Sequence, residues 1–194
     1  MNTMKFCLVV AFAAILSGCM GTYFVRPDDS DLHLGKTSIN DVYKTLGDPY
    51  REYPTSLNDQ ELMFLSYIYV AVGVSSDFDV TPSRTMRLFF WKGVLVSHVY
   101  TSLFISDSSY YDESKRTEIV KGKTTRAEVI KLLGRPSGYG IYPYISDKTG
   151  EALIYSHTTS RGEPNTEKLM NKLLKVTVGP NDIVRDIEYS ESSS

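Results

Sequence analysis

Hydrophobic positions along the chain follow first a helical and then a strand period, and this order occurs twice. Each half begins with a short apolar stripe at helical spacing: Val42, Tyr43 and Leu46, and then Val129, Ile130 and Leu133. Runs rich in β-branched and aromatic residues follow each stripe and predict strands at 62–74, 86–91 and 94–102, and at 151–159, 172–178 and 183–189. The pattern therefore predicts an α+β fold in which each half is a short helical segment packed on a three-stranded antiparallel meander.

A sequence repeat supports this division into halves. Residues 35–49 and 122–136 align without a gap at an offset of 87, and eight of the 15 positions are identical. The identical pairs are Gly35 and Gly122, Lys36 and Lys123, Thr37 and Thr124, Val42 and Val129, Lys44 and Lys131, Leu46 and Leu133, Gly47 and Gly134, and Pro49 and Pro136. We infer a tandem duplication, because one start, stripe and stop repeated at a constant offset is hard to obtain by chance.

Both predicted helices carry start and stop signals. Each begins with the spacing of a capping box, in which a hydroxyl and a carboxylate three residues later satisfy free amides: Ser38 with Asp41, and Thr125 with Glu128. Each ends at a glycine suited to a left-handed C-cap, with a proline two positions later: Gly47 with Pro49, and Gly134 with Pro136.

The first 19 residues have the pattern of an export signal, so we do not expect them to be part of the fold. Lys5 is followed by an apolar run over 6–16 that is too short to span a membrane, and then by Leu-Ser-Gly-Cys at 16–19. This tetrapeptide resembles the lipobox of bacterial lipoproteins. The resemblance implies cleavage between Gly18 and Cys19, a diacylglyceryl thioether on Cys19 and an N-acyl chain such as palmitate. The alternative is an ordinary secretory signal peptide with a cysteine near its end.

Lipid chains on Cys19 would tether the protein to a membrane without spanning it, because more than one acyl chain makes anchoring stable. Met20 stands where inner-membrane retention typically uses Asp, so the resemblance implies the outer membrane, on its periplasmic face by default. We expect six segments: a signal peptide at 1–18, a lipidated tether at 19–32, a first repeat at 33–105, a linker at 106–117, a second repeat at 118–190 and a disordered tail at 191–194.

Composition narrows the possible functions. Cys7 is removed with the signal peptide and Cys19 carries lipid, so no thiol remains for a disulfide, a thiolate metal site or a nucleophile. The mature chain has 20 Lys and Arg (21 less Lys5) against 23 Asp and Glu, a formal charge of −3. This balance argues against binding to nucleic acid.

The sequence predicts no catalytic centre. His33, His98 and His157 are scattered without metal-ligand spacing, and no nucleophile elbow, phosphate-binding loop or zinc pattern is present. We expect no catalytic residues, no metal and no cofactor apart from the lipid on Cys19. The aromatic stretch 139–144 is either a sugar or lipid platform or, more commonly, a loop whose rings cover the junction of helix and sheet.

The repeated motif resembles the BamE (SmpA/OmlA) family of small outer-membrane lipoproteins. The residues that carry it are Gly35, Thr37, Val42, Leu46, Gly47 and Pro49, with Gly122, Thr124, Val129, Leu133, Gly134 and Pro136. Met is usual in the family where Lys36 and Lys123 stand, and family members have one unit. Two units in tandem resemble the β-lactamase inhibitor protein, in which helical segments pack on one face of a sheet and the other face grips an enzyme.

The strand at 62–74 is apolar on both faces, so something is expected to cover its second face. That cover is either the second repeat, which we slightly favour, or a protein partner that contacts Tyr67, Tyr69 and Trp91. We therefore expect a non-catalytic lipid-anchored module for protein interaction, as a scaffold in outer-membrane assembly or envelope integrity, with an unidentified envelope partner. The alternative is a periplasmic inhibitor of a hydrolase that uses the sheet face and a loop at 74–84.

Overall fold

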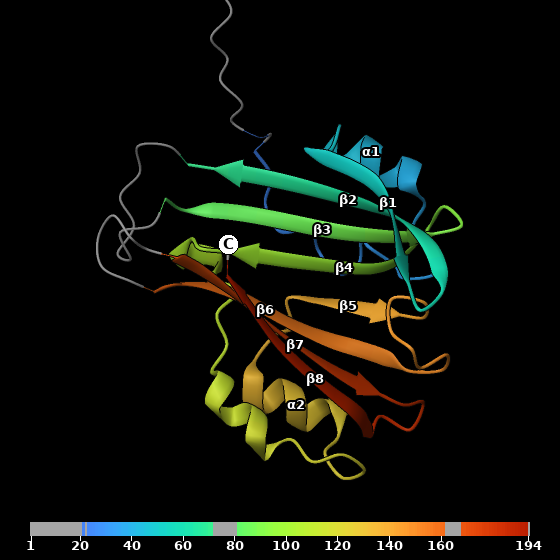
Figure 1. Cartoon of the computed structure of the whole chain (residues 1–194), viewed down its shortest axis with the longest axis vertical. Helices are drawn as coiled ribbons and strands as arrows, with labels where there is room; N and C mark the ends of the chain where they lie inside the picture. Colours follow the sequence, from blue (N-terminus) through green and yellow to red (C-terminus); the bar gives the residue numbers. More distant parts are fainter. Residues whose placement is uncertain (1–20, 22, 72–80, 162–167, 194) are drawn as a thin grey trace, which may run out of the picture.

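The computed structural model describes residues 21, 23–71, 81–161 and 168–193, which form one antiparallel sheet with two short α-helices (Figure 1). The sheet has eight strands in sequence order. They are β1 (Arg51–Leu57), β2 (Gln60–Val70), β3 (Ser83–Trp91), β4 (Val94–Ser102), β5 (Gly138–Ile141), β6 (Glu151–Arg161), β7 (Lys168–Val178) and β8 (Val184–Ser193). Helix α1 (Ile39–Leu46) precedes β1, α2 (Arg126–Leu133) precedes β5, and the 3-10 turns η1 (Ile105–Asp107) and η2 (Glu113–Glu118) lie between the halves.

The prediction of a three-stranded meander in each half is wrong. Each half contributes four strands, and β4 pairs with β5, so that the two halves form one continuous sheet. The two strands that the prediction missed are β1 and β5. β1 is mostly polar, contains Pro54 and lies at the sheet edge, and β5 has only four residues, two of them glycine. β1 has too few apolar residues, and β5 is too short, to carry the signal by which strands are predicted, so pairing with neighbouring strands decides that they are strands.

A turn could have revealed β1. Asn58 and Asp59 join β1 to β2, and both have positive φ, at 48° and 59°. Two consecutive residues of this kind are typical of a two-residue β-hairpin turn, in which Asn and Asp are favoured. The polar stretch before residue 60 is therefore one arm of a hairpin and not a loop.

The helix boundaries that the repeat predicts are confirmed. α1 and α2 are each eight residues long, and both capping boxes are present, at Ser38 with Asp41 and at Thr125 with Glu128. The cap glycines differ from the expected left-handed conformation. Their φ values are positive, at 73° and 81°, but their ψ values are −156° and −164°. This region of backbone conformation is essentially open to glycine alone.

Both helices pack on one face of the sheet, which we call the outer face. Val42 of α1 lies in a buried cluster with residues of β2 to β4, and Val129 of α2 lies in a matching cluster with residues of β6 to β8. The two halves also share a link between strand and helix end. Tyr67 donates to the carbonyl of Gly47 at 2.9 Å, and Tyr155 donates to that of Gly134 at 3.1 Å.

The sheet curls around its opposite face, which we call the inner face. Side chains of β1 and β7 line the same groove, although five strands separate them in the sheet order. A flat sheet would hold them far apart, because neighbouring strands are about 4.8 Å from each other. Twist and curl therefore bring inner-face residues of the two halves together.

Three segments outside the predicted repeats pack on the fold or pair with it, which the sequence did not predict. In the expected tether, Phe24 and Leu32 are buried in the core of the first half. In the expected linker, Tyr111 is buried in the core of the second half. β8 continues to Ser193 and pairs with β7, so residues 191–193 are strand rather than a disordered tail. Among the described residues, no helix is both long and apolar enough to cross a membrane.

Candidate functional site

The inner face carries an open groove with a volume of about 440 Å³. Its lining residues come from both halves: Tyr53, Thr55, Leu57, Phe64, Arg87, Phe89, Val99, Tyr144, Leu173 and Lys175. In β2, β3, β4 and β7 these positions alternate with core residues of the outer face, as the two-residue period of a strand requires. The second apolar face of the first half is thus the wall of a groove that the second half only partly covers.

Four aromatic rings form a row across this groove. Ring centroids are 4.8 Å apart between Tyr53 and Phe64, 5.1 Å between Phe64 and Phe89, and 4.9 Å between Phe89 and Tyr144. Tyr53 is 47% exposed and Phe64 is 9% exposed, whereas Phe89 and Tyr144 are half-buried. Such ring contacts are favourable, and together the four rings form a continuous apolar surface.

The loop between β5 and β6 positions the far end of the row. Asn58 in the turn after β1 donates through Nδ2 to the carbonyl of Pro143 at 2.9 Å. This bond ties the edge hairpin of the first half to the loop that carries Tyr144. The two halves are therefore linked by a direct contact next to Tyr144.

Arg87 is the distinctive side chain of the groove. It is half-buried, and its Nη2 donates to Oγ of Ser156 at 3.2 Å. No carboxylate among the described residues lies within ion-pairing distance of it, whereas Arg84, Arg135 and Arg185 each pair with one carboxylate and Arg126 pairs with two. Burial lowers the pKa of Arg87, because desolvation disfavours the charged form. A guanidinium has five donors, and among the described residues this one makes a single hydrogen bond.

Lys175, the other cation in the lining, is already neutralised. Its Nζ lies 2.6 Å from Oε2 of Glu188 and 5.7 Å from the ring centroid of Tyr144. The ten lining residues include no histidine, cysteine or carboxylate. Among the described residues, the groove thus offers an apolar wall and one guanidinium without an ion-pair partner, an arrangement suited to binding a carboxylate that has apolar neighbours.

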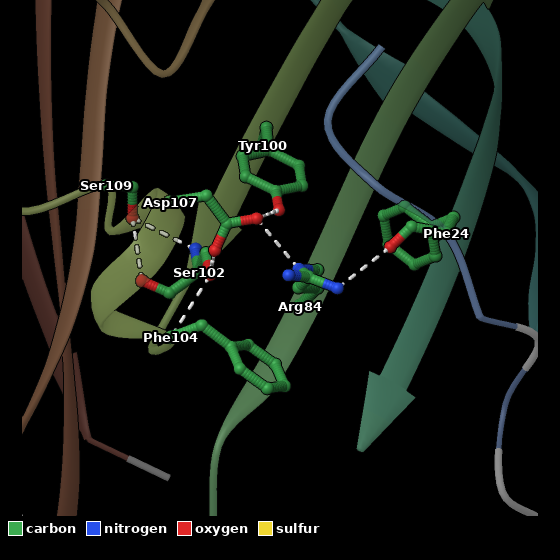
Figure 2. Close-up of polar contacts among 7 residues, drawn as sticks. All are labelled: Phe24, Arg84, Tyr100, Ser102, Phe104, Asp107 and Ser109. Carbon is green, nitrogen blue, oxygen red and sulfur yellow. Dashed lines mark hydrogen bonds and ion pairs between the residues drawn. The ribbon is translucent and has the colours of Figure 1, made fainter. Parts of the chain in front are cut away.

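A second polar cluster lies on the outer face, where β3 and β4 meet η1 (Figure 2). Asp107 accepts from Arg84 Nε at 2.8 Å, from Tyr100 at 2.7 Å and from Ser102 at 2.7 Å. Burial acts to raise the pKa of Asp107, but the hydrogen bonds from Ser102, Tyr100 and Arg84 together outweigh this effect and lower that pKa. Arg84 also donates to the carbonyl of Phe24 at 3.3 Å and lies 4.3 Å from the ring centroid of Phe104.

The second half repeats this cluster with other residues. Lys172 and Tyr189 both contact Glu113, the tyrosine hydroxyl at a distance of 2.7 Å. Lys172 and Tyr189 occupy the strand positions that correspond to Arg84 and Tyr100, because Met86 pairs with Tyr100 as Leu174 pairs with Tyr189. Both carboxylates come from segment 106–117. The charged groups of each cluster pair with one another, so we interpret both clusters as structural contacts that hold this segment against the sheet.

The structure does not bring together the three aromatic residues predicted to contact a partner. Tyr67 is 3% exposed and Tyr69 is half-buried, and both belong to the outer-face core. Trp91 follows Phe89 on the inner face and contacts Tyr142, with 5.9 Å between ring centroids. Sequence reasoning missed Tyr53 and Arg87. The available signal was a charge at position 87, within an otherwise two-sided apolar strand.

The three histidines lie apart in the fold. His33 is exposed, and His98 and His157 are each 4% exposed, in β4 and β6. Within the described ranges, no three His, Cys, Asp or Glu side chains gather as they would around a metal ion. Gly18 and Cys19, and residues 74–80 of the predicted inhibitory loop, lie outside the described residues.

Comparisons with known proteins give little further information. No protein-family model matches the chain, and no curated protein matches it. A crystal structure of a candidate β-lactamase inhibitor protein from Streptococcus mutans matches with a TM-score of 0.39 and 13% sequence identity, over 79% of this chain and 82% of that one. This similarity is too low to support a statement about function. The resemblance to the BamE family stays a prediction from the motif.

Proposed function

We propose that this protein is a non-catalytic, lipid-anchored envelope protein that binds another envelope protein through the inner-face groove. Arg87 carries the proposal, because it is a desolvated cation with no carboxylate partner among the described residues, set in a row of aromatic rings. A half-buried arginine without a counter-charge is costly to the fold. Binding would offset that cost if the partner supplied the missing carboxylate.

The chemistry of the groove indicates the occupant. We propose a loop or extended segment of another protein, with an Asp or Glu that reaches Arg87 and apolar side chains that pack on Phe64, Phe89 and Tyr144. Aromatic and arginine side chains are enriched at the centres of protein interfaces. The formal charge of −3 on the mature chain argues against a nucleic acid in this role. A scaffold role in outer-membrane assembly or envelope integrity would follow from such binding.

Photo-crosslinking in the intact envelope tests this proposal. A benzoylphenylalanine at Tyr53, which lines the groove, is compared with one at Tyr50, which does not; the two side chains are similarly exposed, at 47% and 54%. We expect the residue at 53 to capture one other envelope protein and the residue at 50 not to capture it. Equal capture at both positions, or crosslinks only within the chain, would contradict the proposal.

The role of the charge is tested in the same strain. Arg87→Met keeps much of the side-chain length and removes the guanidinium, so it should abolish the adduct formed at position 53. Arg51→Met is the matched control, because Arg51 stacks on Tyr50 outside the groove, with 5.4 Å between its guanidinium and the ring centroid. If the captured protein is a hydrolase, its activity with and without this protein decides between a scaffold and an inhibitor.

A further inference from the structure

The N-terminal segment is fastened to the sheet almost from the predicted lipid anchor onward. A Cβ at Gly21 would lie 1.7 Å from the carbonyl oxygen of Ile68, so only glycine permits this close approach to β2. Tyr23 contacts Tyr69 edge-on, with 5.1 Å between ring centroids. Phe24 is 6% exposed, and its carbonyl accepts from Arg84, as Figure 2 shows.

This fastening limits how far the fold can stand from an anchored lipid. Met20 alone separates Cys19 from Gly21. Two residues of extended chain span about 7 Å at most. If Cys19 is acylated, the end of β2 near Ile68 must therefore lie within about one headgroup layer of the acyl chains.

One end of the sheet, where β2, β4 and β6 finish, carries exposed apolar side chains. Every strand is antiparallel to its neighbours, so β2, β4 and β6 all finish at the same end of the sheet. The arrowheads of β2 and β4 point toward this end in Figure 1. Tyr23 is 63% exposed, Ile105 69% and Tyr110 67%. We call these three residues, together with the half-buried Phe104, the apolar edge.

Contacts place the apolar edge along the ends of these strands. Phe104 stacks on Tyr69 of β2, with 6.0 Å between ring centroids, and precedes Ile105 directly. Tyr110 lies against His157 of β6, with 5.3 Å between ring centroids. Tyrosine is enriched where membrane proteins meet lipid headgroups, because its ring is apolar and its hydroxyl is polar.

We propose that the apolar edge rests in the headgroup layer of the membrane that holds the acyl chains of Cys19. The inference rests on the lipid anchoring in the proposed function but not on protein binding by the groove. Phe64 lies five residues from Tyr69 along β2, so this part of the groove would stand about 17 Å from the apolar edge.

Site-directed nitroxide labelling of the full-length lipidated protein tests this orientation. The mature chain has no cysteine other than Cys19, which lipid would occupy, so a single added cysteine can be labelled selectively. Labels at Ile105→Cys and Tyr110→Cys are compared with a label at Glu61→Cys, an exposed position near the opposite end of β2. The protein is reconstituted into vesicles of phosphatidylethanolamine and phosphatidylglycerol.

We expect the labels at 105 and 110 to lose accessibility to a water-soluble nickel chelate on reconstitution, and the label at 61 to keep it. Equal accessibility at all three positions in vesicle-bound protein would overturn the inference while leaving the anchor intact. Protein that does not float with the vesicles would overturn both the inference and the anchor, and the crosslinking at Tyr53 would still test the groove separately. Tyr23→Ser should restore part of the accessibility at 105 without releasing the anchored protein.

Discussion

Arg84 Nε lies 2.8 Å from Oδ2 of Asp107, and this pair fastens the segment between the halves to β3 of the first half. The side chain of Arg84 is 9% exposed and that of Asp107 is 24% exposed. In the second half Lys172 contacts Glu113 of the same segment, and these side chains are 18% and 36% exposed. One short segment therefore supplies the carboxylate of both pairs, and the first pair is the more deeply buried.

Removing the carboxylate of the first pair should destabilise the fold more than removing that of the second. Asp107→Asn leaves Arg84 as an uncompensated buried charge, and we expect it to lower the free energy of unfolding by about 3 kcal/mol. Glu113→Gln, in the more exposed pair, should lower it by on the order of 1 kcal/mol. Urea denaturation of both variants measures the two values. The reverse order would show that burial does not set the strength of these fastenings.

The two cap glycines should not tolerate a side chain. A Cβ at Gly47 or Gly134 would meet no atom within 4 Å, so the penalty in Gly47→Ala or Gly134→Ala is backbone strain alone. We expect each change to lower the free energy of unfolding by about 2 kcal/mol. Lys44→Ala is the control, since it changes an exposed residue of α1 that makes only a surface ion pair. Thermal unfolding measures these losses of stability. A loss in Lys44→Ala as large as in the two glycine variants would show that backbone strain at the caps is not the cause.

His98 should make the protein less stable at mildly acidic pH. Burial lowers the pKa of His98 to about 4, despite a raising effect of Asp29. Between pH 6.5 and this value the unfolded chain binds a proton that the folded side chain does not. Stability should therefore be constant above pH 6.5 and fall on acidification by up to about 1.4 kcal/mol per pH unit.

Denaturation of wild type and His98→Leu between about pH 7 and pH 5 measures this slope, because no ordinary carboxylate of the unfolded chain titrates strongly there. We expect a shallower slope in the variant. Some slope should remain, because burial and Lys172 also lower the pKa of His157. Parallel curves for the two proteins would exclude His98 as a source of acid sensitivity.

The two arginines on β3 should respond to mutation in opposite ways. Arg87→Met removes a charge that has no carboxylate partner among the described residues, so stability should be unchanged or higher by about 1 kcal/mol. Arg84→Met removes the partner of Asp107 and should cost about 3 kcal/mol. Urea denaturation measures both changes. A large loss of stability in Arg87→Met would mean that this side chain holds the two halves together through Ser156.

The predicted anchor has a direct test. Cys19→Ser should shift the protein from the membrane to the soluble periplasmic fraction and abolish metabolic labelling with palmitate, because no acyl chain can attach. Circular dichroism of the released protein should match that of the parent domain. Unchanged membrane fractionation without palmitate would place the source of membrane binding elsewhere in the chain.

Signals that act within a few residues were enough to predict several features. Both helices begin and end where the repeat places them, because capping boxes and terminal glycines act over a single turn. Cys19 was identified as the predicted lipid site from a tetrapeptide and an apolar run. The strand predicted at 86–91 implies, by its two-residue period, that Arg87 and Phe89 share one strand face.

Only the tertiary structure decided what these elements build. β1 is a strand because it pairs with β2, and β5 is a strand because it pairs with β4 and β6. The pattern of polar and apolar residues within either segment does not predict this pairing. The curl that brings Tyr53 of β1 and Lys175 of β7 to one groove depends on the twist of all the strands between them. The sequence by itself determined the repeated helices and predicted the anchor, because those signals are local. The continuous sheet, the groove and the position of Arg87, which has no carboxylate partner among the described residues, are relations between distant residues that only packing could decide.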